Sequence, residues 1–332
     1  MKVDRFFEWF EHPPEEPEFE IASVLPRLPR IIVSGAPKAG KSQLTWEIAW
    51  SLFSGDSLLG DKKFWSESGR KVLVLNQENH PRDIYNYLQA RAERSGLMNW
   101  TDDGATWAVP KTEFGSLEFV NTSERRLTWM EDRGDLADYV VDRKIDWLVL
   151  DPAYVLWPGL QFNEGDKVGG ITHALDEFIV ETGTKLILVH HATKNVSKGG
   201  DVWRGMLGST IWQAWVDGFV GVSGEGGFRT IKTEGRVGGG ETIYTSFDKR
   251  TLAWEVLPQE LATNSSGNFD PRKMKAEIRA REIRAWIPIH PDLDDSALAE
   301  KLQTEHPDNE LFTSIKKDTL RKQVARLRKE MS

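Results

Sequence analysis

The sequence predicts an α/β protein in which helices cover both faces of a mostly parallel sheet. Short apolar runs, such as those in 148–150 and 186–189, alternate along the chain with segments of helical periodicity. Strands that are buried on both faces have this nearly uninterrupted apolar character. Four further strand-like segments follow one another between residues 217 and 257 with glycine-containing turns between them, which is typical of antiparallel strands. We therefore expect a parallel sheet with antiparallel strands at its C-terminal edge.

The expected elements follow in a regular order from residue 31. A strand over 31–34 precedes a helix over 42–53, because Leu44, Ile48 and Leu52 recur at helical spacing. The other expected parallel strands are 71–76, 145–151 and 184–191, and the helices between them are 81–96, 125–144 and 170–183. The helix over 125–144 is expected to break near Gly134, since glycine weakens a helix interior. The expected antiparallel strands are 217–224, 228–235, 240–248 and 252–257.

Changes in composition divide the chain into four parts. Residues 1–29 are rich in proline and glutamate and are expected to form an N-terminal arm, and 30–258 hold the α/β core. Residues 259–272 have the composition of a linker. The pattern of 273–332 predicts a small helical C-terminal domain.

Composition and charge exclude several classes of protein and of chemical site. The 332 residues contain no cysteine, which excludes disulfides, thiolate zinc sites and thiol catalysis. The N-terminus has no apolar signal core and no apolar run is long enough to span a bilayer, so we expect a soluble cytoplasmic protein without a membrane partner. The net charge is −8, yet residues 272–332 hold 14 Lys and Arg against 11 Asp and Glu, a net charge of +3 that leaves −11 on the other 271 residues. A tail of opposite sign to the body is a mild indication of a separate contact with a polyanion.

One glycine-rich stretch carries the strongest chemical signal. Residues 35–42 spell G-A-P-K-A-G-K-S, which fits the G-x-x-x-x-G-K-[ST] pattern of a phosphate-binding loop, between a buried strand and an amphipathic helix. Such a loop curls backbone N–H groups round a β-phosphate, its lysine neutralises the β- and γ-phosphates, and its hydroxyl binds Mg²⁺. The alternative is a chance glycine turn. The predicted nucleotide-binding residues are Gly35, Ala36, Pro37, Lys38, Ala39, Gly40, Lys41, Ser42 and Gln43.

Two carboxylates at strand ends complete a predicted hydrolytic site. Asp151 closes the apolar strand 145–151, the position at which an aspartate organises Mg²⁺, so Ser42 and Asp151 are the predicted metal-site residues. Pro152 follows, and no second acid stands beside Asp151. The role of general base therefore falls to Glu78, which ends the strand after the loop helix. The alternatives are an aspartate that caps a turn and a solvated loop glutamate.

Together these stretches resemble a known family. The loop "GAPKAGKS", the strand-end glutamate, "WLVLDP" and the later "LILVHHATK" are similar to the motifs of RecA-fold ATPases, and within them of the RepA-like hexameric helicases, over about Ile31 to Leu257. The resemblance implies a RecA-like P-loop NTPase core with ATP and Mg²⁺ as cofactors and Glu78 activating water. It also implies that the strand-end pair His190 and His191 senses the γ-phosphate. The alternatives for this pair are a histidine bonded to a backbone carbonyl and a metal-binding pair, although neighbours on a strand point to opposite faces.

The segment after the histidines is implied to touch DNA. It is rich in glycine and carries Lys194, Lys198 and Arg204 with few acids, and in the family a mobile loop at this place lines a central channel and follows single-stranded DNA. Lysine and arginine hold phosphates without reading sequence, which suits a translocating motor. A second glycine-rich loop is expected over 152–170. The alternative for both is an ordinary surface loop.

A shared catalytic site between subunits is also implied. In RecA-fold rings and filaments a cation from one subunit reaches the γ-phosphate on the next. Lys232 and Arg236 occupy a similar strand-then-glycine-turn context, and Arg236 is the stronger candidate. The alternative is that both are solvated hairpin charges.

The last two helical stretches, 295–306 and 316–330, have amphipathic patterns. In the second, Leu320, Val324 and Leu327 form one stripe and basic residues lie elsewhere. This is compatible with a helix-turn-helix or winged-helix unit that binds DNA. It is equally compatible with a solvated helix packed on a neighbour.

The predicted function is an ATP-dependent DNA motor, foremost a RepA-like replicative helicase. It would hydrolyse ATP at the interfaces of a homo-oligomeric ring or filament to move along single-stranded DNA, with replication or recombination proteins as partners. One alternative is a RecA-like recombinase that exchanges strands. The alternative from another class is a regulatory switch or scaffold that binds ATP and moves nothing.

Overall fold

The computed structural model describes residues 18–67, 69–101, 104–107, 115–121, 126–159, 165–192, 210–224, 227–236, 240–262, 270–305 and 310–331. The chain divides into two compact units, Met1–Val256 and Leu257–Ser332, and each has an apolar core of its own. Within the described ranges, none of the helices combines the length and the apolar character needed to span a bilayer.

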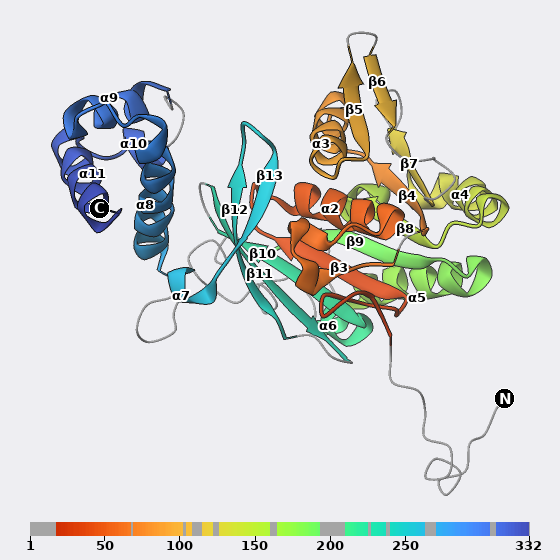
Figure 1. The fold of residues 1–332 in the computed structure, drawn as a ribbon. Coiled ribbons are helices and arrows are strands. Elements are labelled where there is room, and N and C mark those ends of the chain that lie inside the picture. The colour runs from red at the N-terminus through yellow and green to blue at the C-terminus, as the bar shows by residue number, and fades with distance from the viewer. Residues whose placement is uncertain are drawn as a thin grey trace, which may run out of the picture. The chain divides into compact units, whose positions relative to one another are not determined.

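A nine-stranded sheet forms the centre of the first unit (Figure 1). The strand order is β13-β12-β11-β10-β3-β9-β8-β4-β7. The strands are β3 (Arg30–Gly35), β4 (Lys71–Asn76), β7 (Ser116–Asn121), β8 (Trp147–Asp151), β9 (Lys185–His191), β10 (Gly218–Ser223), β11 (Phe228–Gly235), β12 (Thr242–Asp248) and β13 (Ala253–Leu257). From β10 to β7 all neighbours are parallel, whereas β11 is antiparallel to both β10 and β12. The predicted fold class, a RecA-like α/β core with antiparallel strands at one edge, is confirmed.

Helices cover both faces of the parallel half of the sheet. The first face packs against α2 (Lys41–Ser54) and α3 (Pro81–Arg94), and the second against α4 (Trp129–Arg143), α5 (Gly165–Thr182) and α6 (Thr210–Trp215). Because successive side chains of a strand point to opposite faces, Val33 joins the first apolar cluster and Ile32 the second. Burial on both faces explains why these strands are apolar at nearly every position.

Two helices differ from the sequence-based expectation. Helix α4 runs through Gly134 without a break, since it buries Trp129, Leu136 and Val140 along one side and this packing outweighs the low helix propensity of one glycine. Helix α5 begins at Gly165, so residues 165–170 are helical although they were expected in the second glycine-rich loop. The apolar stripe that α5 packs on the sheet already starts at Val168.

The apolar core of the first unit begins before residue 30. Strands β1 (Phe19–Ile21) and β2 (Leu25–Pro26) pair antiparallel, and Ile21 and Leu25 are fully buried in the first cluster. Residues 18–29 of the predicted arm therefore pack into the core, while residues 1–17 lie outside the described ranges. Strand β7 and the hairpin of β5 (Met98–Thr101) and β6 (Gly104–Trp107) were not predicted from the sequence.

The second unit is helical. Its elements are α7 (Gln259–Ala262), α8 (Pro271–Ile289), α9 (Asp295–Glu305), α10 (Glu310–Thr313) and α11 (Lys317–Met331). The buried side chains that hold them together are Ala280, Ile283, Leu298, Ala299, Leu302, Phe312, Leu320, Val324 and Leu327. Helix α8 starts at a capped position, because the Asp270 carboxylate accepts hydrogen bonds from Arg272 N at 2.9 Å and Lys273 N at 3.2 Å.

Candidate nucleotide-binding site

The phosphate-binding loop connects the carboxyl end of β3 to the start of α2 (Figure 1). Its glycines are required sterically, since a Cβ on Gly35 would lie 2.4 Å from Val222 O and Gly40 has a φ of 97°. Helix α2 starts at Gly40 with no side-chain cap and with no acid in its first turn. The first backbone N–H groups of α2 are therefore open to an anion, which fits a bound phosphate.

Lys41 folds back over this loop. Its side chain is buried, and Nζ donates a hydrogen bond to Ala36 O at 3.1 Å. Burial lowers the pKa of Lys41, while the negative charges of Asp151 and Glu78 act in the opposite direction. A buried ammonium that, among the described residues, is bonded to one carbonyl and attracted by two carboxylates is suited to receive phosphate oxygens.

Asp151 lies beside the loop at the carboxyl end of β8. Its carboxylate accepts hydrogen bonds from Ser42 Oγ and from Asn79 Nδ2, each at 3.4 Å. Only 1% of Asp151 is exposed, and this burial raises its pKa to about 6, with the charge of Glu78 adding to the rise and Ser42 and Lys41 opposing it. A buried carboxylate with such long hydrogen bonds gains from a cation, so Ser42 and Asp151 fit a Mg²⁺ ion.

Glu78 stands at the same edge of the sheet. It follows Asn76, which ends β4 and pairs with Asp151 in the parallel β4–β8 register. The Glu78 side chain is exposed, and its charge acts on Lys41, Asp151 and His191. The structure thus brings Lys41, Ser42, Asp151 and Glu78 together, as the order of strand ends in the sequence predicts.

A pair of asparagines fixes the turn that carries Glu78. Asn76 Oδ1 accepts a hydrogen bond from Asn79 N at 3.1 Å, and Asn76 Nδ2 donates to Asn79 O at 2.6 Å and to Asn121 Oδ1 at 2.9 Å. These asparagines were not among the predicted site residues. The signal was present, because asparagine at a strand end favours turns closed by its own side chain.

The two strand-end histidines lie on opposite faces of the sheet. His190 is buried against Trp212, with 5.5 Å between ring centroids, and its Nδ1 donates to His191 O at 2.9 Å. Burial lowers the pKa of His190 to about 4, so its ring is neutral. A metal-binding pair would need both rings on one side, and among the described residues no group of three or more His, Asp or Glu could hold a metal ion.

His191 is the histidine that faces the phosphate-binding loop. It is partly buried, and burial followed by the charge of Lys41 lowers its pKa. Its Nδ1 is buried and has no hydrogen-bond partner among the described residues. Its ring lies 5.3 Å from that of Tyr154, measured between centroids. A ring nitrogen without a partner is available to a group bound in the site.

Two further residues of this region were not predicted from the sequence. Tyr154, in the 3₁₀ turn Ala153–Leu156, lies over His191, and burial together with the charges of Glu78 and Asp151 raises its pKa. Arg229 of β11 is buried, and its Nε donates to Ala39 O in the loop at 2.6 Å. Both contacts depend on how distant strands pair, which a local pattern does not contain.

Arg236 lies near the amino-terminal end of β3, whereas the phosphate-binding loop follows the carboxyl end of the same strand. Strand β11 is antiparallel to β10, and its last residue, Gly235, pairs with Gly218, which pairs with Ile31 at the start of β3. The Arg236 guanidinium donates to Ala214 O and lies 3.9 Å from Asp217. The structure therefore does not bring Arg236 to the loop of its own subunit.

Lys232, another predicted cation, lies in β11, where it pairs with Gly221 and has an exposed side chain. Lys194, Lys198 and Arg204 lie outside the described residues.

Comparisons with known proteins identify the family. A comparison with curated proteins finds no match. Among solved structures, a KaiC-like protein from the hyperthermophilic archaeon Pyrococcus horikoshii is 13% identical, with 74% of this chain and 100% of that chain covered and a TM-score of 0.44. The family model described as AAA domain matches residues 2–197, more than half of the chain, a range that holds the loop, Glu78, Asp151 and both histidines. The chain therefore belongs to the AAA domain family, and its first unit is a RecA-like P-loop ATPase core.

Proposed function

We propose that this protein is an ATP-dependent DNA motor, and specifically a replicative helicase of the RepA-like kind. The proposal rests on one observation above all, the meeting of Lys41, Ser42, Asp151 and Glu78 at one edge of the sheet. Every part that hydrolysis of a nucleoside triphosphate needs has a candidate there. A switch that only binds ATP does not need a base such as Glu78.

Each residue of this site has a distinct proposed role. Gly35 to Gln43 would hold the phosphates through backbone N–H groups and Lys41, and Ser42 with Asp151 would hold Mg²⁺. The ion, when bound, neutralises charge that develops on the phosphate oxygens. Glu78, exposed at the end of its asparagine-fixed turn, would orient a water molecule and take its proton.

His191 supports a link between the nucleotide and DNA. It is the last residue of β9, it faces the loop side, and its Nδ1 has no partner among the described residues. Two residues later the chain enters the segment with Lys194, Lys198 and Arg204, which we propose contacts single-stranded DNA. The presence or absence of a γ-phosphate would therefore change the conformation of the segment that contacts single-stranded DNA.

The position of Arg236 supports an oligomer. Arg236 lies at the end of the strands opposite to the phosphate-binding loop. It is therefore suited to meet a nucleotide only on a neighbouring copy, as in a hexameric ring or filament. To do so it must release Ala214 O and move away from Asp217. Lys232 is the second candidate for this contact.

The test is the rate of ATP hydrolysis with and without single-stranded DNA, followed by unwinding of a forked duplex. A motor is stimulated by single-stranded DNA and separates the fork. Stimulation with strand invasion in place of unwinding would identify the recombinase alternative. Hydrolysis that DNA does not change, or an absence of hydrolysis with retained ATP binding, would contradict the motor and leave the switch.

A further inference from the structure

Helix α11 of the C-terminal unit presents a basic face that the motor proposal does not use. The face consists of the exposed Lys317, Arg321, Lys322, Arg326 and Lys329; the last three lie opposite the buried side of the helix, and Lys317 and Arg321 lie on its flank. The side chains of the first four are 48%, 49%, 71% and 65% exposed. Over its length α11 holds six Lys and Arg against two Asp and Glu.

We propose that the C-terminal unit docks double-stranded DNA through this basic face of α11. The proposal concerns a different surface from the nucleotide site and does not depend on the motor function. Its partner is recognised by the regular phosphates of a duplex and by a groove that admits a helix.

The helix is held in place for such a contact. Leu320, Val324 and Leu327 are fully buried on its inner side and fix it to α8 and α9 through the core of the unit. The basic positions 322, 326 and 329 recur over two turns on the outer side, with the small Ala325 between them. From Lys317 to Lys329 the face is about 18 Å long, enough to follow several phosphates along a groove.

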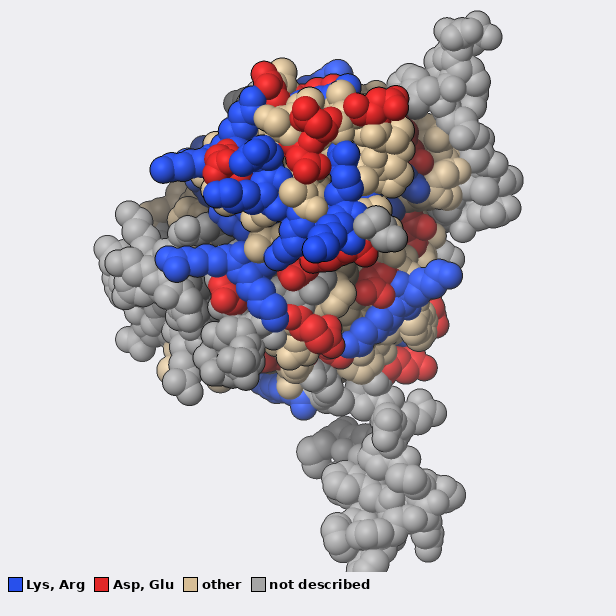
Figure 2. Space-filling view, turned by 60° about the vertical axis from the view of Figure 1, so that its left-hand side comes forward, with Lys and Arg blue, Asp and Glu red and all other residues tan. Residues whose placement is uncertain are grey.

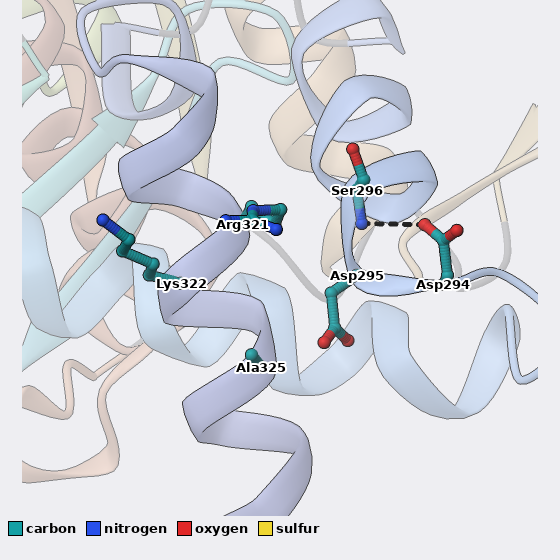
Figure 3. Close-up of a pocket in the computed structure, with 6 residues that line it drawn as sticks. All are labelled: Asp294, Asp295, Ser296, Arg321, Lys322 and Ala325. Carbon is teal, nitrogen blue, oxygen red and sulfur yellow. Dashed lines mark hydrogen bonds between the residues drawn. The ribbon is translucent and has the colours of Figure 1, made fainter.

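The acidic side chains near this face either accept hydrogen bonds from backbone N–H groups or form exposed ion pairs that a phosphate can replace. The Asp294 carboxylate accepts from Ser296 N at 2.8 Å and Ala297 N at 2.7 Å, and Asp295 lies 3.3 Å from Arg328. Figure 3 shows both at the start of α9, across a shallow pocket from α11, with Lys322 extending away from them. Four cations of the face form exposed ion pairs: Arg321 and Lys322 with Asp318 at 2.8 and 2.9 Å, Arg326 with Glu330 at 3.4 Å, and Lys317 with Glu300 at 2.5 Å. Surface pairs of this kind contribute little to stability, so a phosphate can replace the acid.

The chemistry of the face favours a duplex over other polyanions. Single-stranded nucleic acid is held largely by bases stacked on aromatic side chains, and α11 contains no aromatic residue. A protein partner is held mainly by large anchors in desolvated pockets, whereas the cations of this face are exposed on the outside of a helix with the small Ala325 between them. Figure 2 shows Lys and Arg side chains gathered on the surface turned towards the viewer, with Asp and Glu among them, a mixture suited to moderate, salt-sensitive binding.

The test measures binding of a labelled 20-base-pair duplex of mixed sequence to the full chain by fluorescence anisotropy, between 50 and 200 mM salt. The variant Arg321→Ala/Lys322→Ala/Arg326→Ala should bind about tenfold or more weakly at 100 mM salt. For this variant, the slope of log affinity against log salt should be less steep by about two to three, because each lost phosphate contact removes about 0.9 from the slope. The control Lys62→Ala/Lys249→Ala/Arg250→Ala removes the same charge from exposed positions of the first unit and should bind like the parent.

Several outcomes would overturn the proposal. These are absence of duplex binding by the parent chain, equal loss in both triple variants, displacement of the duplex by an equal amount of single-stranded DNA, and displacement by vesicles of phosphatidylserine. If the triple variant melts at a lower temperature than the parent, Lys322→Glu at the most exposed of these positions repeats the test with one substitution. Lys41→Ala should keep full duplex binding, so failure of the nucleotide site and failure of this surface are distinguishable.

Discussion

Asp151 in the ATPase core and Asp294 in the C-terminal unit are the same kind of side chain in opposite physical situations. Asp151 is buried, and burial raises its pKa to about 6. Asp294 is exposed at the start of α9, where the backbone N–H groups of Ala297 and Ser296 lower its pKa. The charge of Asp151 therefore costs stability, whereas the charge of Asp294 contributes to it.

The difference separates a binding site from a structural cap. In the C-terminal unit, the partners of Asp294 are the helix N–H groups themselves, and folding alone satisfies the carboxylate. In the described part of the core, Ser42 and Asn79 give the Asp151 carboxylate two long hydrogen bonds of 3.4 Å, and Lys41 is bonded to a carbonyl. Such incompletely satisfied charges are typical of sites that a ligand completes.

The largest effect is expected for Lys41→Ala. The substitution removes the cation that faces the proposed phosphates and that opposes the rise in the pKa of Asp151. ATP turnover should fall by about 10³-fold or more, since the charge that neutralises the γ-phosphate is lost. Turnover is measured by phosphate release, with Lys62→Ala, at an exposed lysine outside the loop, as the control. Full turnover in the Lys41 variant would contradict the site.

The next effect is expected for Glu78→Gln. Glutamine keeps the size of the side chain and the turn fixed by Asn76, and it removes the negative charge and the ability to accept a proton. Turnover should fall by about 10²-fold or more while affinity for ATP stays within a few-fold of the parent. Binding of a fluorescent ATP analogue and single-turnover hydrolysis separate the two quantities. Equal rates in the parent and the variant would move the base to another residue.

The sequence predicted the central part of this site because its members are close to strand ends. A phosphate-binding loop is contiguous, and Asp151 and Glu78 each stand directly after an apolar strand. In a parallel sheet the carboxyl ends of the strands meet at one edge, so a correct set of strands already places these residues together. The alternation of side chains likewise predicted that His190 and His191 point apart, and the structure adds which of them faces the loop.

The parts that sequence reasoning missed depend on long-range pairing or on weak local patterns. Arg229 reaches Ala39 from the far half of the sheet, and Asn121 meets Asn76 only through the β4–β7 register. Strand β7 lies at the edge and is only partly buried along its length, so its residues lack the apolar run of a central strand. The unbroken α4 is a case in which tertiary packing outweighs a glycine.

A smaller effect, of opposite sign, is expected for the stability of Asp151→Asn. The folded pKa of about 6 lies above the ordinary value of 3.8, so the folded state binds the proton more tightly than the unfolded state. Stability of the parent protein therefore falls as pH rises from about 4 to about 6. At pH 7.5, without nucleotide and with a chelator present, the variant should be more stable by about 1–3 kcal/mol.

The pH dependence provides the internal check for Asp151. Because the parent carboxyl is protonated at low pH, the difference in unfolding free energy between Asp151→Asn and the parent should disappear near pH 4. Urea unfolding curves at pH 4, 6 and 7.5 measure it, with Asp138→Asn on the exposed side of α4 as the control. A variant less stable than the parent at pH 7.5 would mean that the carboxylate stabilises the empty site, and the contrast with Asp294 would fail.

The smallest effect is expected for Asp294→Ala, and it tests the other side of the comparison. Removing the carboxylate leaves Ser296 N and Ala297 N without their acceptor, so hydrogen exchange of the first amides of α9 should accelerate several-fold. The lowered pKa fixes the sign of the pH dependence, because the contribution is present above about pH 4 and is lost as pH falls through the lowered value. The neighbouring Asp292→Ala, exposed and two residues before the cap, should leave exchange unchanged. Equal acceleration in both variants would show that general negative charge near the N-terminus of α9, and not the hydrogen-bonded cap, stabilises this helix.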